Sequence, residues 1–279
     1  KRKGLSWRIL KRYSKIGRKN SMSFFYLISI QYLGFRYHGW QKQPNLKTVH
    51  LMIDKTLNYI FEGAVKFKSL AVGRTDAMVS ANETAFELFS EKPILNFDEF
   101  IAQFNYYLPQ DIRALSINEV DKHFNIIQNA KLKEYVYLFA HGQKAHPFCA
   151  SMMTTFRDAL DIELMAKGAK LFEGTHNFKG FCSNVSDNGL YRREVVSCEL
   201  IENTIITASF FPKVSYLLKV KGEGFGYNQI RTMMGTLVKL GKYEISLEDI
   251  SKSLQPESTE VMDYIAPASG LILNTVEFK

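Results

Sequence analysis

The most constraining feature of this 279-residue chain is an order of hydrophobic patterns that occurs twice. In the first half, β-rich apolar runs alternate with segments whose apolar residues recur at helical spacing. These patterns predict the order strand, helix, strand, strand, helix, strand, over residues 24–30, 48–61, 66–72, 83–89, 96–108 and 112–120. Thr48 and Asn96 are suited to cap the two helices, and Gly63 and Pro109 are suited to end them.

The second half repeats the order. Its predicted elements are strand, helix, two strands, helix and strand, with a short extra helix before the last strand, over residues 134–140, 158–173, 194–202, 214–222, 227–240, 246–254 and 271–278. Each half therefore resembles a split βαβ, ferredoxin-like unit, and the fold class is α+β with antiparallel sheets packed on helices. We expect one lobe over 24–122 and a second over 123–279, joined by the polar segment 121–131, with a ligand cleft between them.

Charge separates the first 23 residues from the rest of the chain. They hold nine Lys and Arg residues and no acid, whereas the whole chain has 36 basic and 28 acidic residues. Without the nine, 27 basic residues face 28 acidic ones, so a polyanion site in the body must be a local patch. Three interpretations of this basic tail stay open: an arm that contacts phosphates, an organelle-targeting segment, or an extension that precedes a natural start at Met22.

Cysteine usage and hydropathy indicate the compartment. Cys149, Cys182 and Cys198 form no CxxC pair, which favours reduced intracellular thiols over a disulfide framework. No apolar run approaches the roughly 18–20 residues that span a membrane. We expect a cytoplasmic protein without a membrane partner, with organelle import through the tail as the alternative.

The segment Ala71–Asp76 places an Arg and an Asp in a turn directly after an apolar strand. Gly73 can adopt backbone conformations that other residues avoid, so the strand can end there. Arg74 and Asp76 then directly follow the end of the strand. A carboxylate next to a guanidinium stays ionised, which suits a nucleophile or a base. The competing interpretation is a turn Asp that caps its own backbone beside a surface Arg.

Aromatic and amide side chains follow the first strand. The run from Tyr32 to Pro44 includes Tyr37, His38, Trp40, Gln41 and Gln43. Such residues suit stacking on bases and hydrogen bonding to phosphates, although a loop packed by its own Trp and Tyr would look the same.

Two later segments offer further candidates. Tyr135 and Tyr137 share one face of a predicted strand, where a tyrosine could stack on a base or exchange a proton, with core packing as the alternative. The segment Phe225–Gly235 begins a predicted helix, and Arg231 lies beside the buried apolar stripe of that helix. The charge of Arg231 therefore needs a carboxylate or phosphate partner.

Two other patterns are weak. In the glycine loop at 222–226, the third glycine of a dinucleotide-binding motif would fall at Tyr227, which disfavours a nucleotide-dependent enzyme. His141, His146 and Cys149 lack a fourth ligand at motif spacing, so we expect no metal site there.

Taken together, six blocks in order over residues 24–279 resemble the tRNA pseudouridine synthase A (TruA) family. The blocks are the run with Tyr32, Gly34, Tyr37, Gly39-Trp40-Gln41 and Gln43; Gly73–Asp76; the strand with Tyr135 and Tyr137; Gly174–Phe178, which looks like a family turn; Gln229–Gly235; and Ala266–Leu271.

The resemblance implies a function and a site. It implies a pseudouridine synthase fold with a central RNA-binding cleft, and an isomerase that converts uridine to pseudouridine in the anticodon stem-loop of tRNA, at tRNA positions 38–40. Asp76 would be the nucleophile, and Arg74 would pair with it and help to open the base stack. Tyr135 would pack on the uracil and take the proton from C5, and Arg231 would bridge to Asp76 across the cleft.

The resemblance also implies a homodimer without cofactor or metal, with Tyr37, His38, Trp40, Gln41, Gln43 and Gln229 at the substrate. The chain departs from the family pattern after Asp76, where Met78 replaces a glycine, Ser80 replaces a histidine, and Leu33 stands in place of a frequent aspartate. The rival hypothesis is therefore a catalytically impaired relative that binds and remodels tRNA.

Overall fold

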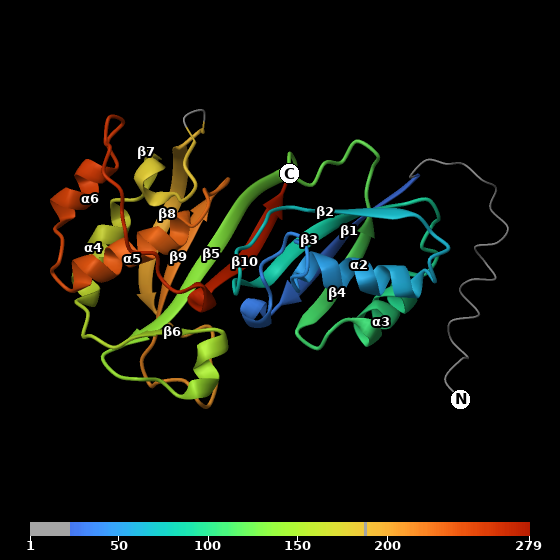
Figure 1. Ribbon diagram of the computed structural model, residues 1–279, viewed down its shortest axis with the longest axis horizontal. Coiled ribbons are helices and arrows are strands. Elements are labelled where there is room, and N and C mark those ends of the chain that lie inside the picture. Colours follow the sequence, from blue (N-terminus) through green and yellow to red (C-terminus); the bar gives the residue numbers. More distant parts are fainter. Residues whose placement is uncertain (1–22, 187–188) are drawn as a thin grey trace.

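The computed structural model describes residues 23–186 and 189–279. Its described part is a mixed α+β structure in which ten strands form one large, mostly antiparallel sheet. The basic tail, apart from Ser23, lies outside the described residues. Figure 1 shows the sheet running the length of the molecule, with β5 (Ala130–His141) and β10 (Leu271–Phe278) at its middle.

The first half has the predicted order of elements. They are β1 (Phe24–Tyr32), the 3-10 turn η1 (Gly34–Arg36), α2 (Val49–Ile60), β2 (Phe67–Ala71), β3 (Ser80–Ser90), α3 (Phe97–Tyr107) and β4 (Ile112–Glu119). The Thr48 side chain accepts a hydrogen bond from Leu51 N, and the Asn96 side chain accepts one from Glu99 N. Both predicted caps are confirmed, because each satisfies a backbone donor that the first helical turn leaves open.

The second half also follows the predicted order, with additional short elements. They are β5, η2 (Pro147–Ser151), β6 (Thr154–Phe156), α4 (Ile162–Lys170), β7 (Gly174–Asn177), η3 (Lys179–Phe181), β8 (Arg192–Glu202), β9 (Tyr216–Gly222), α5 (Gln229–Gly241), α6 (Leu247–Ser253), η4 (Ala268–Gly270) and β10.

Three details of the second half were predicted wrongly. The helix expected over 158–173 is α4 and begins only after Asp161, whose side chain caps Leu164 N. The segment at 174–178, expected as a turn, contains the edge strand β7, which pairs with β8. The short strand β6, which lies beside β5, was not predicted.

Strand order shows how the halves join. The first half follows β4-β1-β3, with β2 also paired to β3 over Phe86–Ser90, and the second half follows β10-β5-β9-β8-β7. The two meet where β10 pairs in parallel with β3, at Ile272–Ser80 and Leu273–Ala81. The end of β3 that follows the predicted Arg-Thr-Asp turn therefore lies beside the last strand of the chain.

The helices of both halves cover the same face of the sheet. Tyr135, Tyr137 and Phe139 are every second residue of β5, so their side chains share one face of the strand. Tyr137 and Phe139 belong to the core under α4, α5 and α6, and Tyr135 also packs against the core under α2 and α3. Tyr135 therefore sits where the two helical layers meet.

The opposite face is covered by connecting segments. Residues of the expected linker pack there: Ile126 is fully buried beside Val72 and Ala85, and its backbone N–H donates to the Glu87 carboxylate. Further along, Cys149, Met153 and Phe210 cover the β5 and β9 side of the sheet. Of the helices described, none has both the length and the apolar character that crossing a bilayer requires.

Candidate active site

The turn that carries Asp76 leaves β2 and returns as β3, and the loop after β1 supports it from behind. Trp40 N donates to the Thr75 carbonyl at 3.0 Å, and Met78 N donates to the Tyr37 carbonyl at 3.0 Å. A Cβ on Gly39 would lie 2.7 Å from the Thr75 oxygen, and its φ of +82° also favours glycine. The turn and this loop are thus fixed to each other through their backbones.

A cleft of about 510 Å³ opens beside this turn. Asp76 and Arg74 line it from the first half, Tyr135 and Lys133 line it from β5, and the residues from Phe225 to Ile230 close it from the start of α5. The Tyr135 ring meets the Phe225 ring edge to face, with 5.5 Å between ring centres. The cleft therefore combines a carboxylate, cations and an aromatic wall.

Asp76 faces Arg231 across this cleft. The Arg231 Nη1 atom lies 4.0 Å from Asp76 Oδ2, and the two side chains are 18% and 23% exposed. Arg231 is held in place because its Nε donates to the Ala266 carbonyl at 2.8 Å and its Nη1 to Asn228 Oδ1 at 3.0 Å. Burial raises the pKa of Asp76, and the positive charge of Arg231 partly offsets that rise.

Arg74 does not occupy the place that sequence spacing suggested. Its side chain is exposed at the edge of the cleft, and the basic group that pairs with Asp76 among the described residues is Arg231. Arg74 and Asp76 lie in an irregular turn and not in a regular strand, so their spacing in the sequence does not fix the directions of their side chains. The Asp76 carboxylate also caps no backbone N–H within the described chain, unlike an ordinary turn aspartate.

The two tyrosines of β5 have different surroundings. Tyr137 is fully buried, and its hydroxyl donates to the Pro267 carbonyl at 2.7 Å and contacts Thr154 Oγ1 at 2.9 Å. Tyr135 lines the cleft, where burial and the negative charge of Asp76 raise the pKa of its phenol above the ordinary value. Tyr137 is a core residue, and Tyr135 is a neutral phenol at the candidate site.

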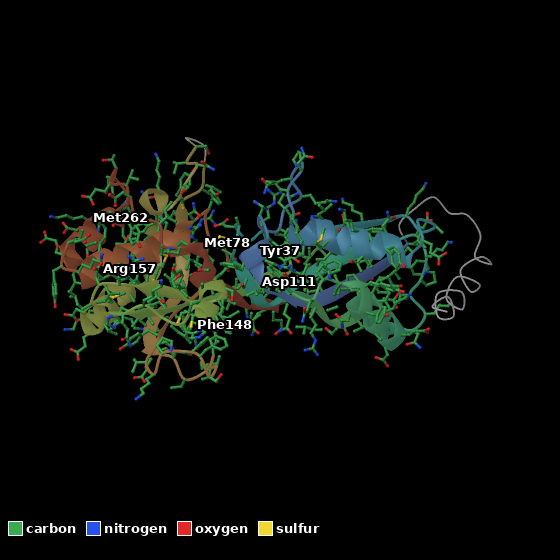
Figure 2. The ribbon with its side chains drawn as sticks, turned by 60° about the horizontal axis from the view of Figure 1, so that its bottom comes forward. Tyr37, Met78, Asp111, Phe148, Arg157 and Met262 are labelled. Carbon is green, nitrogen blue, oxygen red and sulfur yellow. The ribbon has the colours of Figure 1, made fainter. Side chains whose placement is uncertain are left out.

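The candidate substrate loop divides into buried and exposed residues. Tyr37 and Trp40 are each only 2% exposed, and the Tyr37 hydroxyl donates to Asp111 Oδ1 at 2.6 Å. Figure 2 shows Tyr37, Asp111 and Met78 near the middle of the molecule. The two rings hold the loop in place and present no stacking face here, whereas the side chains of His38, Gln41 and Gln43 are exposed.

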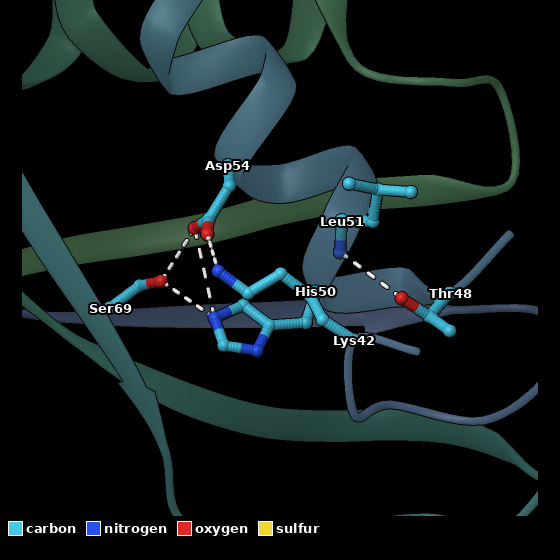
Figure 3. A network of polar contacts seen from close by, with 6 residues as sticks. All are labelled: Lys42, Thr48, His50, Leu51, Asp54 and Ser69. Atoms are coloured by element: carbon cyan, nitrogen blue, oxygen red, sulfur yellow. Dashed lines mark hydrogen bonds and ion pairs between the residues drawn. The ribbon is translucent and has the colours of Figure 1, made fainter. Parts of the chain in front are cut away.

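A polar network fixes the other side of Trp40. The His50 ring stacks on Trp40 at 5.6 Å, and its Nε2 shares a hydrogen bond of 2.8 Å with Ser69 Oγ. Ser69 in turn donates to Asp54, which also pairs with Lys42 (Figure 3). This network ties α2 to β2, the strand that leads into the Asp76 turn.

Gln229 begins α5 at the wall of the cleft. It is 1% exposed, and its Oε1 accepts a hydrogen bond from Gly226 N at 2.7 Å. Its Nε2 is buried and has no partner among the described residues. In this structure Gln229 therefore shapes the start of α5 beside Arg231.

Sequence reasoning missed two features of the site. Lys133 lines the cleft, and the signal that could have found it was its place two residues before Tyr135 on the same face of β5. Ser80 takes a structural position, because its Oγ accepts a hydrogen bond of 2.9 Å from Gly34 N behind the Asp76 turn.

The geometry defines a chemical capability. A part-buried carboxylate opposite a fixed guanidinium can act as a nucleophile or a base, and the arginine stabilises its charged form. The aromatic edge beside it suits a planar ring. The site thus fits chemistry on a nucleobase or on the sugar attached to it.

Comparison with known proteins also points to chemistry on a nucleobase and its sugar. The family model for tRNA pseudouridine synthase matches residues 169–279. The chain is 31% identical over 245 residues to tRNA pseudouridine synthase A of Exiguobacterium sibiricum, covering 88% of this chain and 93% of the relative. It is 30% identical over 256 residues to tRNA pseudouridine synthase A of Methylacidiphilum infernorum, covering 91% and 95%. It is 29% identical over 261 residues to tRNA pseudouridine synthase A 2 of Bacillus thuringiensis subsp. konkukian, covering 91% and 99%.

Proposed function

Because this chain belongs to the tRNA pseudouridine synthase A family, we propose that it isomerises uridine to pseudouridine in tRNA at the cleft around Asp76. The observation that carries the proposal is the pairing of Asp76 with Arg231 beside the ring of Tyr135. A carboxylate, a fixed cation and an aromatic wall are the groups that such a reaction requires at one place.

The reaction breaks the bond between C1′ of the ribose and N1 of uracil, and then joins C1′ to C5. Asp76 supports it in one of two ways: its carboxylate attacks C1′, or it removes the C2′ proton to form a glycal. After the uracil rejoins through C5, the C5 proton must leave, and we assign a part in that transfer to Tyr135, which lines the cleft. N1 ends with a proton, so the product is an isomer of the substrate.

The target uridine must leave its stack before it reaches Asp76, at a cost of a few kcal/mol. Contact with an aromatic ring contributes about 1–3 kcal/mol per base, which offsets much of that cost. We assign the ring to Tyr135 and the opening of the stack to Arg74, which is exposed at the edge of the cleft. The exposed His38, Gln41 and Gln43 are the members of their loop that remain available to RNA.

We extend the proposal to the target uridine, the lobes that hold the RNA, and the compartment and assembly of the protein. The substrate is a uridine of the anticodon stem-loop, the cleft between two ferredoxin-like lobes holds the RNA, and the lobes extend over 24–122 and 123–279. The protein works in the cytoplasm as a homodimer, and sedimentation velocity of the full chain tests its oligomeric state.

A second candidate function is tRNA binding without chemistry. The observation that favours it is Met78, two residues after Asp76, whose φ of +66° is a left-handed conformation that favours glycine. A bulky residue there brings a side chain, 36% exposed, to the turn that carries the carboxylate.

One experiment separates the two functions. Unmodified tRNA is incubated with wild type, with Asp76→Ala and with Asp98→Asn, and pseudouridines are mapped by carbodiimide treatment and primer extension. Asp98 is an exposed carboxylate in the first turn of α3, so Asp98→Asn controls for loss of one negative charge.

We expect new stops with wild type and Asp98→Asn, and a loss of about three orders of magnitude or more with Asp76→Ala. Binding of tRNA by Asp76→Ala should persist, because that carboxylate repels phosphate. No stops from a wild-type protein that binds tRNA would instead establish the binding function. The positions of the stops test the assignment to the anticodon stem-loop.

A further inference from the structure

Lys133 is a cation in the cleft that has no acidic partner among the described residues. It lies on the face of β5 that also carries Tyr135, and both side chains line the cleft. The Lys133 ammonium donates one hydrogen bond, to the Val72 carbonyl at 3.1 Å, at the start of the turn that carries Asp76. An ammonium has three donors, so two remain after this bond.

The charges around Lys133 are not balanced from within the protein. Burial lowers the pKa of Lys133, and no neighbouring carboxylate counters this effect. The carboxylate of Asp76 is paired with Arg231, whose charge is the one that lowers the Asp76 pKa. A part-buried cation without a counter-charge costs free energy, so the cleft is electrostatically incomplete without a bound anion.

The Lys133 ammonium lies close to Gly73, where a side chain would crowd it. A Cβ at Gly73 would lie 3.2 Å from Lys133 Nζ and would face no other residue as closely. Gly73 and Lys133 both line the cleft, so the ammonium can be reached from it where the chain turns toward Arg74 and Asp76. An anion bound there would share the cleft with the candidate carboxylate and would not displace Arg231.

We propose that Lys133 binds a phosphodiester of the RNA backbone next to the target uridine. This inference rests on the proposed function, since it requires RNA in the cleft. Lysine suits the role because its ammonium is a point charge that accepts phosphate oxygens from several directions. The bond to the Val72 carbonyl fixes the ammonium, so the phosphate is held at a set distance from the Asp76 turn.

The test measures tRNA binding to the full chain over a series of KCl concentrations. The variants are Lys133→Met, which keeps the length of the side chain, and Lys133→Arg, which keeps its charge. The control is Lys252→Met on α6, which removes a lysine that is exposed and paired with Glu248. It changes the net charge equally but lies outside the residues that line the cleft.

We expect the slope of log K against log salt to become shallower by about 0.7–0.9 in Lys133→Met, the change for one lost phosphate contact. The slope should stay unchanged in Lys133→Arg and in Lys252→Met. If Lys133 only supports the Val72 carbonyl, Lys133→Met lowers the melting temperature and leaves the salt slope unchanged, which overturns the proposal.

The outcome is distinguishable from failure of the proposed function. A wild-type protein that binds tRNA but forms no pseudouridine contradicts the enzyme function, while the salt slopes still decide the role of Lys133. A wild-type protein that does not bind tRNA overturns both.

Discussion

At the scale of single residues, one charge pair lies across the cleft of the candidate site. Asp76 comes from the turn between β2 and β3, and Arg231 comes from the first turn of α5. Burial favours the protonated carboxyl of Asp76, whereas Arg231 favours the ionised form. The fraction of reactive carboxylate at acid pH therefore depends on a residue that is remote in the sequence.

This balance predicts how the pH profile responds to Arg231→Met. The change removes the charge that opposes the effect of burial, so the pKa of Asp76 rises further. Because the carboxylate is the reactive form, the acid limb of the single-turnover rate at saturating tRNA should move to higher pH. Arg231→Lys keeps a positive charge and should move the limb less. Equal acid limbs in wild type and Arg231→Met would show that another group controls the profile.

The sequence proposed Asp76 as the candidate carboxylate, but spacing alone did not give its partner. Spacing placed the guanidinium at Arg74, and only the resemblance to a family pointed to Arg231. A partner brought in by tertiary packing leaves no local pattern, whereas Lys133 has one, since it lies two residues before Tyr135 on the same face of β5. The sequence also could not show that Tyr135 lines the cleft while Tyr137 belongs to the core, since both lie on one strand face and differ only in what packs over them.

At the scale of elements, the Asp76 turn is defined by the loop behind it. A Cβ on Gly34 would lie 2.0 Å from the Val79 carbonyl oxygen, so η1 packs directly on the backbone of the turn. Met78 N donates to the Tyr37 carbonyl, which holds Met78 in its left-handed conformation. The strain at Met78 is thus imposed by its neighbours and is not a local preference.

Met78→Gly should therefore stabilise the protein by about 1 kcal/mol, because glycine adopts this φ without the steric cost that a Cβ brings. Chemical denaturation monitored by fluorescence measures the change in the free energy of unfolding. Met78→Ala is the matched control, since it removes the long side chain but keeps the Cβ, and its stability should stay close to that of wild type. A similar gain in both variants would assign the effect to the side chain and would contradict the backbone explanation.

Elements with strong periodicity or capping residues were predictable, and those defined by pairing were not. Thr48 and Asn96 fixed the starts of α2 and α3, because a polar cap before an apolar stripe is a local signal. The four-residue strand β7 was missed because it exists through its pairing with β8. Helix α4 begins later than expected because Asp161 caps it, while Leu160 is buried outside the helix.

At the scale of the whole molecule, the sheet places the two halves of the site together. The parallel pairing of β10 with β3 brings the Asp76 turn next to β5, which carries Tyr135. The candidate site therefore needs both halves, although each half follows its own strand order. The sequence predicted the repeated order of elements, whereas the continuity of the sheet depends on a pairing between β3 of the first half and β10, the last strand of the chain.

The net positive charge of the whole chain is concentrated in its first residues. The first 21 residues hold nine basic side chains, whereas the remainder has nearly balanced charge. If they contact phosphates, deleting residues 1–21 should weaken tRNA binding and make its dependence on salt less steep, because fewer counterions are released. The single-turnover rate at saturating tRNA should not change, since the cleft residues are intact.

A second variant separates charge from length. Replacing the nine basic residues by glutamine keeps the segment but removes its charge, and it should reproduce the salt dependence of the deletion. An unchanged salt slope in both variants would reject the phosphate-binding arm and leave the cleft as the origin of the electrostatic attraction. In that case Lys133 and the exposed Arg74 would account for a larger share of the slope, since the body of the protein carries little net charge to supply the rest.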